Sequence, residues 1–150
     1  MYDRVLVALD GSEPSERIVR WLSRVLGGAG ATIHLLTVRP PAQALAYEGR
    51  TITYVDQAED MARAQALDAL RPVASRLAED GFVVVPEVRF GEPAPTVLAA
   101  ARELEVDLIA LASRGIGGVR RLWTKSVARR LLREAPVPVL VARRTAPRVA

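Results

Sequence analysis

The chain has 150 residues, of which 50% are hydrophobic, with no cysteine, one histidine and a net charge of +4. This length suits one domain with a substantial core, and the absence of cysteine excludes disulfides, thiolate metal sites and cysteine nucleophiles. One histidine argues against a Ser-His-Asp triad, and no apolar run is long enough for a membrane span. Because the first residues do not read as a signal peptide, we expect a single cytoplasmic domain over residues 1–150.

Short apolar runs alternate with amphipathic helical patterns along the chain. The expected strands are residues 5–9, 32–38, 83–88, 107–111 and 137–142. The expected helices follow Ser12 and then cover about 56–79, 93–104 and 127–134. Strands separated by helices predict an α/β fold, with a mainly parallel, doubly wound five-stranded sheet and helices on both faces.

Some elements carry more detailed expectations. In the first helix one apolar face is expected from Ile18, Val19, Leu22, Val25 and Leu26, and in the second the core candidates are Met61, Leu67, Leu70, Val73 and Leu77. Pro72 is expected to kink or split the second helix. Pro86 suits an edge strand, and residues 40–55 are expected to be irregular.

The carboxyl ends of the strands are the expected ligand site. In open parallel sheets, ligands bind at these ends, where the strand order changes direction. The positions that this rule selects are Ala8, Leu9, Asp10, Val38, Leu111 and Ala112. Asp10 could accept hydrogen bonds from a ribose or an adenine, or it could cap the following helix.

A basic segment near the end of the chain is the expected anion site. Residues 113–144 hold nine Arg or Lys residues and one acid, so the segment carries +8 and the rest of the chain −4. Glycine and a helix N-terminus can present N–H groups to a phosphate, which selects Arg114, Gly115, Lys125, Ser126 and Val127. Ser126 is expected to cap the last helix. The alternative is a capped helix after an ordinary solvated loop.

Other chemistry is less well supported. His34 lies mid-strand among apolar residues and is expected to be a structural histidine with satisfied hydrogen bonds. Nucleic-acid binding is not expected, because the basic excess is local and aromatic residues make up only 5% of the chain. No cluster with metal-ligand spacing is present in the sequence.

Several segments together resemble the universal stress protein family over nearly the full length. They are Asp10-Gly11-Ser12, Gly91-Glu92-Pro93, Asp107-Leu108-Ile109, the stretch 113–118 and Ala135-Pro136-Val137-Pro138 with the valine-rich run after it. The resemblance implies strand order 3-2-1-4-5 and ATP, with or without Mg²⁺, as the ligand. The family's nucleotide motif falls on Ala112, Gly115, Lys125 and Ser126, where Ala112 and Lys125 replace glycines.

The resemblance implies a stress-response module that binds an adenine nucleotide with little or no catalysis. Lys125 could pair with a phosphate or obstruct it. If it fills the phosphate site, the chain would be an interaction protein of the same fold; a third possibility is an enzyme acting on a phosphorylated metabolite. Family members pair the last strand between protomers, which implies a homodimer through Val137, Val139, Leu140 and Val141.

Overall fold

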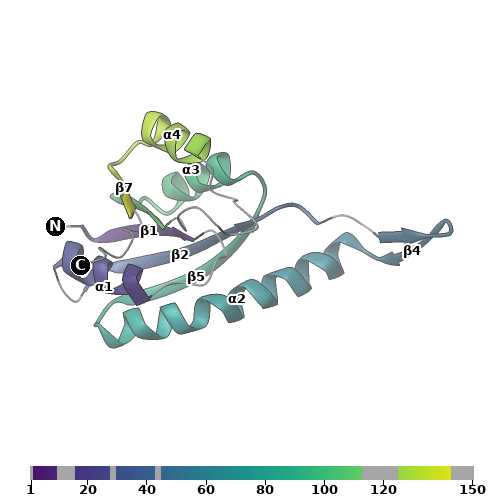
Figure 1. The fold of residues 1–150 in the computed structure, drawn as a ribbon, viewed down its shortest axis with the longest axis horizontal. Helices are drawn as coiled ribbons and strands as arrows, with labels where there is room; N and C mark the ends of the chain where they lie inside the picture. Colours follow the sequence, from purple (N-terminus) through teal and green to yellow (C-terminus); the bar gives the residue numbers. More distant parts are fainter. Residues whose placement is uncertain (1, 10–15, 28–29, 43–44, 113–124, 143–150) are drawn as a thin grey trace, which may run out of the picture.

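The computed structural model describes residues 2–9, 16–27, 30–42, 45–112 and 125–142 (Figure 1). The strands are β1 (Arg4–Leu9), β2 (Thr32–Arg39), β3 (Leu45–Tyr47), β4 (Arg50–Thr53), β5 (Val83–Phe90), β6 (Leu108–Ala112) and β7 (Val139–Ala142). The helices are α1 (Glu16–Leu26), α2 (Val55–Glu79), α3 (Pro93–Glu103) and α4 (Lys125–Glu134).

The main sheet has the order β5-β2-β1-β6-β7, and each of its neighbouring pairs is parallel. Counting only these five strands along the chain, the order is 3-2-1-4-5, so the predicted fold class and topology are confirmed. The chain moves outward from β1 to β2 and β5, then returns to β6 on the other side of β1. The strand order therefore changes direction between β1 and β6, the position where parallel sheets bind ligands.

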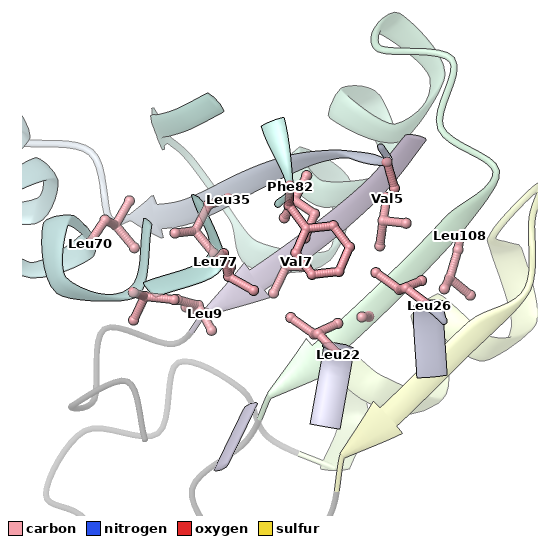
Figure 2. Close-up of a cluster of buried hydrophobic side chains, with 14 of the residues drawn as sticks. Val5, Val7, Leu9, Leu22, Leu26, Leu35, Leu70, Leu77, Phe82 and Leu108 are labelled. Carbon is pink, nitrogen blue, oxygen red and sulfur yellow. The ribbon is translucent and has the colours of Figure 1, made fainter. Parts of the chain in front are cut away.

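Two apolar cores lie on opposite faces of the sheet. The face covered by α1 and α2 holds Val5, Val7 and Leu9 of β1 together with Leu22, Leu70 and Leu77 (Figure 2). The other face packs against α3 and α4, with Leu6, Ala8, Val97, Leu98 and Leu131 in its core. Alternate residues of β1 thus serve the two cores, which is why this strand is apolar without interruption.

The outer edge of β5 carries two features that oppose the addition of another strand. The N–H groups of Val83 and Gly91 bond to Ala31 and Arg39, so odd-numbered residues of β5 face β2 and Pro86 faces outward, where its missing donor costs no sheet hydrogen bond. The outward carbonyl of Val88 accepts a hydrogen bond from Arg63 Nη1 at 3.1 Å. Pro86 therefore lies on an edge strand, as expected.

Two details of the second helix differ from expectation. Helix α2 is not split at Pro72, because the proline falls in a 25-residue helix supported by the buried residues Leu70, Val73 and Leu77 on the sheet. Met61 is 64% exposed rather than part of the core, since the first turns of α2 run past the sheet. In α1, Val25 was expected on the apolar face of the helix, but its side chain is 42% exposed.

The stretch expected to be irregular contains an antiparallel hairpin made of β3 and β4. Its two-residue turn places Glu48 at φ 49° and Gly49 at φ 77°, which is the left-handed pair that a tight hairpin requires. The largest shifts in strand boundaries are in β5, which extends to Phe90, and in β7, which begins at Val139 instead of Val137.

The imidazole of His34, in β2, does not have all its hydrogen bonds formed. Its Nδ1 atom is buried and has no hydrogen-bond partner among the described residues, which corrects the expectation from the sequence. Desolvation lowers the pKa of His34; the nearby Glu87 carboxylate opposes this shift, and the Arg4 guanidinium adds to it. The neutral imidazole is therefore the form that the folded chain favours.

This shift predicts a loss of stability in mild acid. The unfolded chain takes up the His34 proton near the ordinary pKa of about 6.5, before the folded chain does, so the free energy of unfolding should fall as the pH decreases below that value. Urea unfolding of the wild type should show a lower midpoint at pH 5.5 than at pH 7.5. His34→Gln should lose less over this interval, and an equal loss in both proteins would contradict the prediction.

Candidate functional site

The ends of four strands lie level at one edge of the sheet. Leu9 is in register with Thr37 of β2 and with Ala112 of β6, and Ala112 is in register with Ala142 of β7. The chain leaves the sheet at this edge through the segments after Leu9 and after Ala112. β1 and β6, which end at Leu9 and Ala112, lie on either side of the point where the strand order changes direction.

Several predicted contact residues are core residues. The side chains of Ala8, Leu9, Val38 and Leu111 are at most 4% exposed, and they pack into the two cores described above. These side chains are turned away from any ligand at the edge. They hold the ends of the strands in place.

A residue that the sequence analysis missed lies at the same level. Thr37 is 3% exposed and is the buried polar residue of the described chain. It shares a register row with Leu9 and Ala112. A threonine after the apolar pair Leu35 and Leu36, near the end of β2, was the available signal.

Helix α4 starts near this edge. It connects the parallel strands β6 and β7, so it must run back against the strand direction and begin on the carboxyl side of the sheet. Its first residue is Lys125, so Ser126 lies within the first turn and is not the N-cap that the sequence suggested. Ser126 is exposed, and the half-buried Val127 packs toward the α3 core.

The beginning of α4 is suited to an anion. The first N–H groups of a helix have no partner within the helix, and the helix dipole adds positive potential there. The first turn of α4 carries no acidic residue. The arrangement could therefore hold a phosphate next to the strand ends.

The turn between β5 and α3 depends on a glycine. Gly91 has φ +150°, and a Cβ there would lie 2.7 Å from Thr96 Oγ1. Its N–H donates to the Arg39 carbonyl at 2.9 Å, which ties the turn to the last residue of β2. Gly91-Glu92-Pro93 therefore fixes the start of α3 beside the same edge of the sheet, with Glu92 as the N-cap.

Three predicted site residues, Asp10, Arg114 and Gly115, lie outside the described residues. Of the remaining candidates, the structure brings the ends of β1, β2 and β6 together and places the start of α4 on the same side. In the described part of the chain no three His, Asp or Glu side chains gather as a possible metal site. No described helix has the length and apolar character needed to cross a membrane.

Comparison with known proteins decides the family. The sequence model of the universal stress protein family matches residues 1–143. The chain belongs to the universal stress protein family. This universal stress protein is 28% identical over 148 residues to universal stress protein YxiE of Bacillus subtilis (strain 168), a match that covers 95% of this chain and 100% of YxiE.

Solved structures share the fold. The hypothetical protein MJ0577 has a TM-score of 0.77 at 21% identity, over 97% of this universal stress protein and 99% of that chain. The Arabidopsis thaliana protein At3g01520, solved with AMP bound, has a TM-score of 0.65 at 19% identity (99% and 96% coverage). A universal stress protein solved in complex with cAMP has a TM-score of 0.64 at 20% identity (95% and 97% coverage).

Proposed function

We propose that this chain is a stress-response module that binds an adenine nucleotide, ATP, at the carboxyl ends of β1, β2 and β6. The observation that carries the proposal is the strand order, which changes direction between β1 and β6 at the edge where Leu9 and Ala112 end in register. The start of α4 and the +8 segment that contains it supply the positive potential that phosphates need. AMP and cAMP in two solved proteins of this fold support an adenine nucleotide as the ligand.

In this proposal, Asp10 contacts the nucleoside and Lys125 contacts the phosphates. Asp10 directly follows β1, whereas Lys125 opens α4. A carboxylate accepts hydrogen bonds from hydroxyl or amino groups and repels phosphates, which is why we assign it to the sugar or base. Ser126 and Val127 add N–H groups of the first helical turn.

Asp10→Ala should weaken adenosine and ATP binding alike, by about tenfold, the effect of losing one or two hydrogen bonds to a charged group. Isothermal titration with adenosine, ATP and inorganic phosphate measures this. Asp10→Asn is the matched control, because it keeps an acceptor oxygen and should lose less. If Asp10→Ala instead lowered phosphate binding equally, or destabilised the fold by several kcal/mol, Asp10 would be a helix cap.

We also propose a homodimer through the edge of β7 that has no neighbouring strand among the described residues. The Ile109 N–H donates to the Pro138 carbonyl at 3.0 Å, so Pro138 and Leu140 face β6, whereas the backbone groups of Val139 and Val141 face outward. Pro138 therefore removes no donor from the free edge. The side chains of Val139, Leu140 and Val141 are half-buried, and the outer backbone groups of a strand at a sheet edge can pair with a second copy.

Val141→Pro should abolish association through β7 and so lower the mass measured for the wild type, because it removes an outward N–H without removing a hydrogen bond to β6. Val84→Pro on β5 is the matched control: its N–H also faces outward, but on the edge already occupied by Pro86 and Arg63, so the oligomer should not change. Light scattering reports the mass, and circular dichroism reports the fold. A wild type that is monomeric at tens of micromolar, or a Val141→Pro protein with the same mass as the wild type, would contradict this interface.

A further inference from the structure

One part of the chain projects away from the body of the molecule. It consists of the β3–β4 hairpin and the first turns of α2, residues 45–65, here called the arm (Figure 1). A helix of 25 residues is about 37 Å long, whereas the eight residues of β5 span about 26 Å. The buried residues of α2 begin only at Ala66. The arm therefore extends beyond the sheet that supports the rest of the helix.

The arm exposes apolar side chains. Tyr54 is 62% exposed, Val55 40% and Met61 64%, and these are three of the seven large hydrophobic residues that are exposed in the described chain. A two-stranded hairpin is marginally stable by itself in water and needs a further surface to pack on. The hairpin strands contact each other, but their contacts with the other described elements are few. The arm therefore presents an uncovered apolar surface that a partner could bury.

The charges of the arm indicate what kind of surface would cover it. Residues 54–65 contain Asp56, Glu59 and Asp60 and one base, Arg63. Arg63 is directed to the body of the molecule, where it bonds to the Val88 carbonyl and lies 5.2 Å from the centre of the Phe90 ring. The complementary surface is therefore apolar at its centre and basic around it.

Helix α4 carries such a surface. Leu132 is 58% exposed, and the exposed Arg129 and Arg133 lie at i−3 and i+1 from it, with Arg133 also ion-paired to Glu134 at 3.4 Å. The exposed leucine could meet Met61 or Tyr54 while the arginines meet the acids of the arm. The arm cannot reach α4 of its own chain, because α2 and α4 cover opposite faces of the sheet.

We propose that the arm of one copy docks on the exposed face of α4 of a second copy. Each chain offers one arm and one α4, so a reciprocal exchange closes a dimer with two equivalent contacts. This contact uses neither β7 nor the nucleotide site, so it can be tested separately from both.

The test uses sedimentation velocity in a Val141→Pro background, so that association through β7 does not contribute. Met61→Glu in the arm and Leu132→Glu on α4 should each weaken self-association by about tenfold or more, as loss of a central apolar anchor does. Val83→Glu is the matched control, because Val83 is similarly exposed, at 57%, on β5. Circular dichroism should remain unchanged in all of them.

Mixing two variants tests whether the arm of one copy contacts α4 of another. An equimolar mixture of the Met61→Glu and Leu132→Glu proteins should associate more than either alone, because one intact arm then meets one intact α4. The charge reversals Asp60→Arg and Arg129→Glu should each weaken association, and the double variant should recover part of it. If Met61→Glu lost association while Leu132→Glu associated as the background protein does, the arms would be pairing with each other, and the proposal would be overturned. A background protein that is monomeric at the highest concentration studied would overturn it too.

Discussion

Replacing Gly91 with alanine is expected to lower the free energy of unfolding by about 2–3 kcal/mol, which is the sum of backbone strain and a steric contact. The φ of +150° belongs to a region that residues with a Cβ rarely adopt, and the new Cβ would lie 2.7 Å from Thr96 Oγ1. The same turn donates the hydrogen bond to Arg39 and begins α3. Urea unfolding followed by circular dichroism measures the change.

Two further variants separate the causes. Gly30→Ala carries similar backbone strain at φ +115°, but nothing lies within 4 Å of its Cβ, so its loss of stability should be smaller. Thr96→Ala in the Gly91→Ala protein should recover the part due to the contact and leave the part due to φ. Equal losses in Gly30→Ala and Gly91→Ala would show that the contact with Thr96 is unimportant.

Lys125→Gly is expected to weaken ATP binding by about tenfold, because the ammonium group at the start of α4 would no longer pair with a phosphate. Adenosine binding should change little, and the salt dependence of ATP binding should decrease. Lys125→Met separates charge from length: it keeps the chain length but should lose affinity as Lys125→Gly does. Isothermal titration at two salt concentrations measures all three proteins.

The opposite result has a definite meaning. Glycine is the residue that the family's nucleotide motif carries at this position, so tighter ATP binding by Lys125→Gly would show that the lysine obstructs the phosphate. The chain would then fit the alternative of an interaction protein whose phosphate site is filled by its own side chain. Unchanged affinity would place Lys125 outside the site.

The main sheet could be predicted because its strands are nearly continuous apolar runs. Val5 to Leu9 and Leu108 to Leu111 are buried on both faces of the sheet, and this burial leaves little freedom in where such segments lie. The same logic located the edge at which we propose that the nucleotide binds. Pro86 also indicated an edge strand, because a proline is tolerated where no backbone N–H is needed for a sheet hydrogen bond.

Local patterns failed where tertiary context decides. The helical period of α2 continues through Met61, but the sheet ends before that turn, so the pattern alone could not show its exposure. The hairpin was missed because Glu48 is an unusual residue for a left-handed turn position. Ser126 was taken as a cap because helix ends are uncertain by one or two residues in any sequence pattern. No pattern in the sequence indicated that the Nδ1 atom of His34 would be buried.

Isothermal titration of nucleotide-free wild-type protein with ATP tests the nucleotide proposal most directly. We predict saturable binding of ATP and AMP, with inorganic phosphate much weaker, and a rise in the melting temperature that grows with ATP concentration. Asp10→Ala should bind ATP more weakly under the same conditions. If millimolar ATP with Mg²⁺ gave no heat of binding and no shift in melting temperature, adenine-nucleotide binding by this chain would be contradicted.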